Sequence, residues 1–235
     1  MTHYRAPQNN NTPDATASAG HGLPDGSENF AYFPAFIRVT GKKVLVLGGG
    51  EVALGKLRLL IRSQAQITVV APEICDDIAV MVDEGRIVWE NAPFVDTMVN
   101  GAAMVFDAAD DPYLTTRLQA ATKRRNILLN VVDRTPHCDF IVPAILDRSP
   151  VMITISTGAC APALARIIRQ RLETVLPASM SQLARIARDA RQKVADHLHD
   201  NLSRQRFWTH FFQRGLQTRS MSCPARVSVA ALSSI

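Results

Sequence analysis

Residues 43–60, KVLVLGGGEVALGKLRLL, decide the fold. Four apolar residues lead into three glycines, and an apolar pattern of helical spacing follows the turn. This order predicts a strand, a tight turn and a helix. The spacing Gly48-x-Gly50-x-x-Ala53 fits the dinucleotide-binding fingerprint, in which the last position accepts Gly or Ala.

Each small residue of this turn has a physical reason. Gly48 can adopt backbone angles that a Cβ forbids, Gly50 leaves no side chain between the backbone and a pyrophosphate, and Ala53 lets the helix lie close to the strand. The helix dipole and the first N–H groups then face the phosphates. The pattern predicts a dinucleotide site. A glycine-rich turn in an α/β protein that binds no nucleotide is the alternative.

Apolar runs and turn residues extend this unit into a sheet. We predict further strands at residues 66–70, 86–89, 102–106 and 127–132, with helices over residues 74–84 and 111–124. Asp111 followed by Pro112 is typical of a helix start. The alternation of strands and helices predicts a doubly wound, mostly parallel, Rossmann-like sheet domain, which we place at residues 30–142.

The flanking segments differ in composition. Residues 1–29 are rich in Asn, Gly, Ser, Thr and Pro, and we expect a disordered leader there. Beyond the sheet domain we predict a strand at residues 151–156 and helices at residues 163–176, 180–198 and 202–213. Residues 161–214 carry ten Lys and Arg against four acids. We expect residues 216–235 to form a disordered tail.

Composition narrows the classes of function. The chain has 235 residues, 47% of them hydrophobic and 20% charged, so a sizeable core can form. The net charge of +5 favours anionic partners. None of the four cysteines forms a CxxC pair, which argues against a zinc knuckle or a dithiol redox site. The chain shows neither an apolar signal sequence nor a bilayer-length apolar run, so we expect a cytoplasmic protein that contacts no membrane.

Several motifs occur together in one order. They are VLGGGEVALGK, TVVAPE, NVVD, CDFIVPAILDRSP, ISTGACAPALARIIRQRLE and RFWTHFF. This set resembles the dehydrogenase and chelatase module of the siroheme synthase family, which also exists as a stand-alone protein. The resemblance implies an NAD-dependent precorrin-2 dehydrogenase that makes sirohydrochlorin, and in bifunctional relatives the same site inserts ferrous iron. It also implies a homodimer, with a dimerisation segment at residues 143–178, a helical domain at residues 179–215, and the tetrapyrrole between domains.

Asp133 is the candidate catalytic residue. It follows the strand ILLNVV, at the carboxyl edge where open α/β sheets bind ligands. A carboxylate there can accept the proton that accompanies hydride removal. The resemblance places the family's general acid/base in this NVVD motif. An Asp that ends a strand before Thr135-Pro136 is the alternative interpretation.

The cofactor candidates follow three strands. The resemblance assigns contacts with the dinucleotide to Glu51 and Val52 in the glycine turn and to Pro72 and Glu73 after the second strand. The usual ribose-binding acid would stand at residues 70–71, which are Val and Ala, so Glu73 either reaches the ribose or starts a helix. No Arg stands there to receive a 2′-phosphate, which favours NAD over NADP.

Two further candidates follow the strand at residues 102–106. Ala109 and Asp110 could contact the adenosine side of the cofactor, with helix capping as the equal alternative for Asp110 and Asp111. Asp107 stands where a small apolar residue is usual, either as a second carboxylate in the cleft or as a hydrated side chain.

The candidate tetrapyrrole contacts lie in the loop before the basic helix. Ser156, Thr157 and Gly158 match the family's hydroxyl-bearing loop, and hydroxyls and loop N–H groups suit carboxylate side chains. An ordinary turn before a helix is the alternative. Arg166, Arg169 and Arg171 could bind the many carboxylates of a tetrapyrrole, although a solvated helix face explains any one of them.

Two other interpretations remain. His137, Cys138 and Asp139 are adjacent, and adjacent residues rarely converge on one ion, so we predict no stable metal site and a structural role for Asp139. The competing function is a dinucleotide sensor or regulator whose basic helices contact nucleic acid. The long helix predicted at residues 180–198 fits a compact helix-turn-helix poorly, so we expect no nucleic-acid partner.

Overall fold

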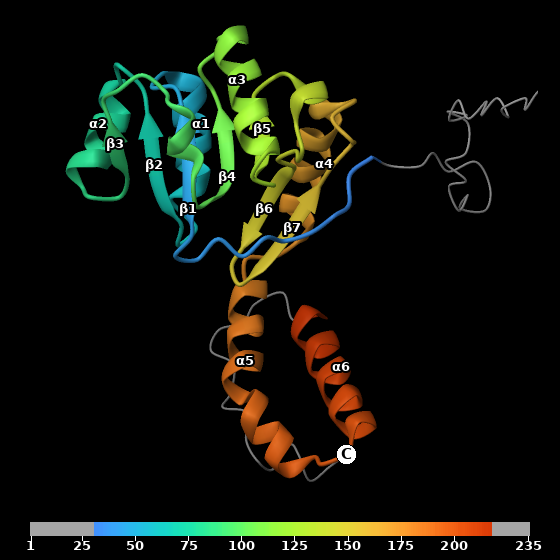
Figure 1. Cartoon of the computed structure of the whole chain (residues 1–235). Coiled ribbons are helices and arrows are strands. Elements are labelled where there is room, and N and C mark those ends of the chain that lie inside the picture. Colours follow the sequence, from blue (N-terminus) through green and yellow to red (C-terminus); the bar gives the residue numbers. More distant parts are fainter. Residues whose placement is uncertain (1–30, 218–235) are drawn as a thin grey trace, which may run out of the picture. The chain divides into compact units, whose positions relative to one another are not determined.

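The sheet domain is built on five parallel strands. The computed structural model of the chain describes residues 31–217, and the residues described from 36 on belong to one structural unit. The strands lie in the order β3-β2-β1-β4-β5, with β1 in the middle (Figure 1). Their bounds are β1 Lys43–Leu47, β2 Gln66–Val70, β3 Val88–Glu90, β4 Ala102–Asp107 and β5 Leu128–Val131. All five strands are parallel, and the order in which they are added to the sheet reverses between β1 and β4, as in a Rossmann fold.

Helices cover both faces of this sheet because alternate residues of each strand point to opposite sides. Val44 and Val46 join the core beneath α1 (Glu51–Leu60) and α2 (Asp76–Asp83). Leu45 and Leu47 join the core with α3 (Pro112–Lys123) and the 3₁₀ turn η1 (Asp96–Val99). All four side chains are at most 1% exposed, and burying each one contributes about 2 kcal/mol. The predicted doubly wound sheet is therefore confirmed.

The start of α3 follows the local signal in the sequence. The carboxylate of Asp111 accepts hydrogen bonds from the backbone N–H groups of Tyr113 and Leu114, and Pro112 occupies the first turn. Asp111 is thus the N-cap that the Asp-Pro pair predicted. This cap fixes where the chain leaves the β4 edge, next to Asp110.

Beyond the parallel sheet, β6 (Ala144–Arg148) and β7 (Val151–Ile155) form an antiparallel pair. Only β7 was predicted, and β6 was missed. Three helices follow, and all three coincide with the predicted ones: α4 Pro162–Val175, α5 Met180–His197 and α6 Asn201–Gln217. In α5 and α6, Leu183, Val194 and Phe207 are buried. Gly215 of α6 lies so close to Leu183 of α5 that a Cβ there would meet the leucine side chain.

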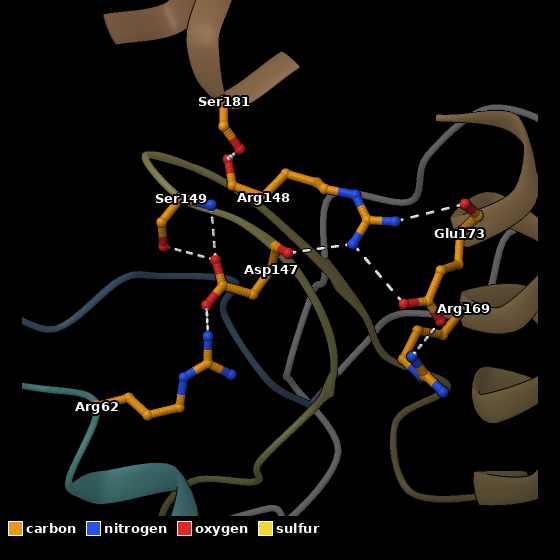
Figure 2. Close-up of polar contacts among 7 residues, drawn as sticks. All are labelled: Arg62, Asp147, Arg148, Ser149, Arg169, Glu173 and Ser181. Carbon is orange, nitrogen blue, oxygen red and sulfur yellow. Dashed lines mark hydrogen bonds and ion pairs between the residues drawn. The ribbon is translucent and has the colours of Figure 1, made fainter. Parts of the chain in front are cut away.

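The turn between β6 and β7 connects three parts of this unit (Figure 2). The carboxylate of Asp147 forms an ion pair with Arg62, which follows α1, and accepts hydrogen bonds from the backbone N–H and the hydroxyl of Ser149, at 2.7 and 2.5 Å. The Ser149 hydroxyl holds the pKa of the Asp147 carboxyl below its ordinary value of 3.8. Asp147 therefore joins the hairpin to the sheet domain as a carboxylate.

The neighbouring Arg148 extends the same connection to the helices. Its guanidinium lies 3.7 Å from the Glu173 carboxylate of α4, which also pairs with Arg169 at 2.7 Å. The Arg148 carbonyl accepts a hydrogen bond from the Ser181 hydroxyl of α5 at 2.9 Å (Figure 2). Two consecutive residues of β6 thus contact α1's end, α4 and α5.

Among residues 31–217, no helix combines the length and apolar character that crossing a membrane requires. The predicted leader at residues 1–29 lies outside the described residues, as do residues 218–235 of the predicted tail. Residues 216 and 217, which were also assigned to the tail, belong to α6.

Candidate functional site

The glycine turn between β1 and α1 has the geometry that a dinucleotide phosphate needs. Gly48 has φ +106°, and a Cβ on it would lie 2.6 Å from the carbonyl oxygen of Ala108. Gly50 is the exposed N-cap of α1, and a Cβ on it would have nothing within 4 Å. The space before the helix is therefore open, with no capping side chain in it. These residues fit a bound pyrophosphate, held by the first N–H groups of α1.

Gly49 must also be a glycine, although the dinucleotide-binding fingerprint accepts any residue at this position. A Cβ on Gly49 would overlap the carbonyl oxygen of Glu73 in the loop after β2. The Gly49 carbonyl also accepts a hydrogen bond from the backbone N–H of Cys75 at 2.9 Å. The run of three glycines was the signal for this contact, since only a residue without a side chain lets the two loops touch.

Four cofactor candidates lie around this turn. Glu51 and Val52 are exposed in the first turn of α1, and Pro72 and Glu73 are exposed in the loop that packs on Gly49. The structure therefore brings the two predicted pairs to the same edge of the sheet, at the carboxyl ends of the neighbouring strands β1 and β2.

A cavity of about 230 Å³ lies at the carboxyl ends of β4 and β5. It brings together three predicted site residues, Val52 from the first turn of α1, Asp110 from the loop after β4 and Asp133 from the loop after β5. Its lining is completed by Asp107, Ala108, Thr115, Val131, Val132 and Arg134. Ala109 and the residues of the β2 loop are not part of this lining.

Asp133 occupies the position after β5 that the sequence predicted. Its side chain is exposed at the cavity, and its backbone has φ +59°, a left-handed conformation that costs free energy in a non-glycine residue. The neighbouring Val132 N–H donates to the carbonyl of Asp107 at 2.9 Å. This ladder bond between β4 and β5 fixes where the Asp133 carboxylate leaves the sheet.

Asp110 and Arg134 form an ion pair at the rim of the cavity. The Arg134 guanidinium lies 3.0 Å from the Asp110 carboxylate, whose side chain is 90% exposed. Asp110 also has a positive φ, +52°. It does not cap α3, because Asp111 does. Sequence reasoning missed Arg134, since nothing in the sequence indicates that the loops after β4 and β5 meet.

Asp107 is neither hydrated nor free. It is 2% exposed, its carboxylate accepts a hydrogen bond from the Thr115 hydroxyl at 2.6 Å, and it accepts a second from the Ala109 N–H at 3.2 Å. The hydrated alternative is therefore wrong, because α3 covers this end of β4. A buried carboxylate lies in the wall of the cavity.

The predicted tetrapyrrole contacts lie in the loop between β7 and α4, outside the lining of this cavity. The Ser156 hydroxyl accepts from the Gly158 N–H and the Thr157 hydroxyl accepts from the Ala161 N–H, both at 3.1 Å. Each hydroxyl oxygen stabilises the loop as an acceptor, and the hydroxyl can also donate a hydrogen bond. Arg166 is exposed on α4.

The segment after Asp133 closes the free edge of β5. The Asp139 carboxylate accepts from the Leu129 N–H at 2.9 Å, and the Asp139 N–H donates to the Leu129 carbonyl at 2.8 Å. The Cys138 thiol contacts the Val131 backbone, and burial raises the pKa of this thiol. The structural role predicted for Asp139 is confirmed. Within residues 31–217, no three His, Cys, Asp or Glu side chains are grouped to hold a metal ion.

A larger hollow, of about 490 Å³, runs along α3 and the outer side of β5. It is lined by residues such as Gln119, Lys123, His137 and Asp139 and contains none of the predicted catalytic or cofactor residues. The smaller cavity is the better candidate site because Val52, in the first turn of α1, and Asp133 both line it.

Comparison with known proteins agrees with this geometry. Residues 35–144 match a family described as "Putative NAD(P)-binding", and residues 179–219 match the sirohaem synthase dimerisation region. Siroheme synthase of Photorhabdus laumondii is 41% identical over 181 residues, and siroheme synthase 1 of Pectobacterium atrosepticum is 40% identical over 181 residues. The chain is therefore similar to siroheme synthases over most of its own length. The resemblance seen in the motifs is thereby confirmed.

The matches cover different shares of this chain and of its relatives. Each match covers 77% of this chain but 38% of the siroheme synthase, so the chain spans less than half the length of those relatives. A solved structure of SirC, a precorrin-2 dehydrogenase, is 20% identical and covers 80% of this chain and 93% of its own, with a TM-score of 0.68. That likeness shows the fold, and it supports the predicted fold class.

The family matches also bear on the domains. The NAD(P)-binding match coincides with the sheet domain, so the expected class of cofactor is confirmed. The dimerisation match covers α5 and α6, whereas the resemblance predicted a dimerisation segment at residues 143–178. The boundaries of the domains stay predictions.

Proposed function

We propose that this chain catalyses the NAD-dependent oxidation of precorrin-2 to sirohydrochlorin. The observation that carries the proposal is the cavity lined by both the first turn of α1 and Asp133, in a chain similar to siroheme synthases. In this proposal, Asp133 would act as a proton acceptor beside a cofactor anchored on the glycine turn. The regulator alternative receives no such support, because a regulator needs no carboxylate at this position.

The glycine turn and its neighbours would hold the cofactor. The N–H groups at Glu51 and Val52 face the open space before α1 and suit the pyrophosphate. The Glu73 backbone lies against Gly49, and Pro72 precedes it in the same loop. There the Glu73 carboxylate could bind a ribose hydroxyl and repel a 2′-phosphate. This arrangement supports NAD over NADP. When bound, NAD supplies the nicotinamide carbon that accepts a hydride.

Asp133 would take the proton. Oxidation of precorrin-2 breaks a C–H bond as its hydride leaves, and a proton leaves the same macrocycle, so that NAD becomes NADH and one proton is released. The Asp133 carboxylate is exposed to the cavity and held at a fixed backbone angle, as a general base needs to be. Ser156, Thr157, Gly158 and Arg166 would bind carboxylates of the tetrapyrrole through hydroxyl, N–H and guanidinium donors.

The test compares Asp133→Asn with Asp111→Asn. The second variant removes one charge from a neighbouring loop and keeps a good N-cap. With precorrin-2 and NAD, we expect NADH formation by Asp133→Asn to fall by about 10²-fold or more, with NAD affinity unchanged. Asp111→Asn should stay within about twofold of the parent. Undiminished turnover in Asp133→Asn would remove the role of Asp133, and an inactive parent chain would remove the proposed function.

Homodimer formation is part of the proposal. The match to the sirohaem synthase dimerisation region at residues 179–219 supports it. On α4, Leu164, Ile167 and Val175 recur on one face and are 50%, 47% and 74% exposed, as an uncovered interface would be. Light scattering after size-exclusion chromatography should give twice the chain mass, and a monomer at micromolar concentration would contradict the proposal.

Insertion of ferrous iron into sirohydrochlorin rests on the resemblance alone. Iron would be a substrate in that reaction, together with sirohydrochlorin. Adding both to the chain without NAD tests the activity directly. A rate equal to the uncatalysed background would exclude it and would leave the dehydrogenase proposal intact.

A further inference from the structure

The strand order predicts where each half of the dinucleotide would lie. This inference rests on the proposed function, because it takes NAD as the cofactor. With the pyrophosphate at the start of α1, the adenosine ribose lies toward the loop after β2, which here is the Glu73 loop packed on Gly49. The nicotinamide half must then extend the other way, toward β4 and β5. The cavity lies on that side.

This geometry changes the role expected for Asp110. From the sequence, Asp110 was expected to contact the adenosine half of the cofactor. The structure instead groups Asp110 with Asp133 and Arg134, and not with Glu73. We therefore assign Asp110 to the nicotinamide side. The ionisable side chains of the cavity lining are three aspartates and one arginine, which gives the lining a formal charge of −2.

Asp107 is the innermost of these charges. Its side chain is enclosed by β4 and α3, and both of its contacts are donors, the Thr115 hydroxyl and the Ala109 N–H. This is the pattern that an ionised carboxylate requires. The first turn of α3, with the positive end of its dipole, begins five residues further on. Unlike Asp110, Asp107 is shielded from solvent, so its charge acts on a bound group with little screening.

The two forms of the cofactor differ in charge at the ring. The nicotinamide of NAD⁺ carries a positive charge, whereas the dihydronicotinamide of NADH is neutral. We propose that the buried carboxylate of Asp107 makes this site bind the oxidised dinucleotide in preference to the reduced one. Any repulsion between Asp107 and the pyrophosphate is common to both forms and cancels in the ratio of their affinities. The preference would favour loading with the oxidant and release of NADH after turnover.

The test measures dissociation constants, independently of turnover. NAD⁺ is titrated by calorimetry and NADH by its fluorescence, against the parent chain and Asp107→Asn. Asparagine keeps the shape, can accept from the Ala109 N–H, and can donate to the Thr115 oxygen, but it has no charge. We expect the affinity for NAD⁺ to fall about five- to tenfold while the affinity for NADH changes less than about twofold, as loss of one charge in a weakly screened site would produce.

Two control variants separate charge from position. Thr115→Val removes the hydroxyl contact and keeps the Asp107 charge, so the ratio of NAD⁺ to NADH affinity should stay at its parent value. Asp111→Asn removes an exposed charge from the loop after β4 and should also leave the ratio unchanged. If Asp107→Asn does not fold, Asp107→Ala combined with Thr115→Val replaces both buried partners by apolar groups and should lower the ratio equally.

The outcomes distinguish this inference from the proposed function. The inference is supported if the ratio of NAD⁺ to NADH affinity falls in Asp107→Asn and stays unchanged in both controls. An unchanged ratio in Asp107→Asn, or an equal fall in Thr115→Val, overturns it and leaves the dehydrogenase proposal standing. If the parent chain binds neither NAD⁺ nor NADH, the proposed function fails together with the inference.

Discussion

Asp139 provides a quantitative test of how the sheet edge is closed. Its carboxylate accepts from the Leu129 N–H at 2.9 Å, and its own N–H donates to the Leu129 carbonyl. Leu129 is 1% exposed, so its N–H has little access to water once this partner is removed. A buried donor left without a partner costs about 1–3 kcal/mol. Because Asp139 itself is exposed, we expect Asp139→Ala to lower the free energy of unfolding by about 1.5 kcal/mol.

The matched variants isolate this contact. Asp139→Asn keeps an oxygen acceptor and should cost about 0.5 kcal/mol, since a neutral acceptor is weaker than a carboxylate. Glu84→Ala breaks a surface ion pair with Arg86, at 3.2 Å and with side chains 51% and 45% exposed, and should cost less than about 0.5 kcal/mol. The hydrogen bond from the Leu129 N–H to Asp139 should therefore contribute more to the free energy of unfolding than the ion pair between Glu84 and Arg86.

Urea unfolding followed by fluorescence measures these differences. All variants are made in a Trp208→Phe background, so that Trp89 reports on the sheet domain, where its indole N–H donates to the Ala71 carbonyl. A loss below about 0.5 kcal/mol in Asp139→Ala, or equal losses in the Ala and Asn variants, would refute the reasoning. Either result would mean that water or another group satisfies the Leu129 N–H.

Further predictions concern the glycine turn, the β6–β7 hairpin and the cysteines. Gly49→Ala should lower the melting temperature, because its Cβ overlaps the Glu73 carbonyl. Gly50→Ala should melt like the parent and lose NAD affinity in a titration, since its Cβ points into open space. Asp147 has a lowered pKa, so its stabilisation is present above its ordinary value of 3.8 and is lost as pH falls through the lower folded pKa. As pH falls below 3.8, Asp147→Asn should therefore lose less free energy of unfolding than the parent chain. The same dependence of stability on acid pH in both chains would contradict the role of the carboxylate. Cys160 is exposed, whereas burial raises the pKa of the Cys138 thiol. Iodoacetamide should label Cys160 faster than Cys138, as measured by peptide mass spectrometry, and equal rates at these two cysteines would refute the difference.

The parts of the fold that local chemistry specifies were predictable. The apolar runs gave all five strands of the parallel sheet, and Asp111-Pro112 gave the start of α3. The strand β6 was missed because its residues, AILDR, follow a proline and have little alternation. That strand exists because β7 pairs with it and Arg62 binds Asp147, contacts that neighbouring residues in the sequence do not reveal.

The same distinction applies to the candidate site. Asp133 was predictable because it lies two residues after a buried strand, and the prediction required only the position of a strand end. The pairing of Arg134 with Asp110 joins residues 24 apart in sequence, and the contact of Asp107 with Thr115 depends on how α3 lies over β4. Sequence patterns place residues on elements, but which side chains meet depends on the packing between elements.

The backbone at the cavity shows why the fold sustains an unfavourable local geometry. Asp110 and Asp133 both have positive φ, +52° and +59°, although neither is glycine. Such conformations cost of order 1 kcal/mol each and persist only where the surroundings enforce them. Asp107 enforces both conformations through hydrogen bonds to the preceding residues. Its carboxylate accepts from the Ala109 N–H, just before Asp110, and its carbonyl accepts from the Val132 N–H, just before Asp133. Because two carboxylates are thus turned toward one cavity at a cost in stability, replacing Asp110 by glycine should stabilise the chain while weakening whatever the cavity binds.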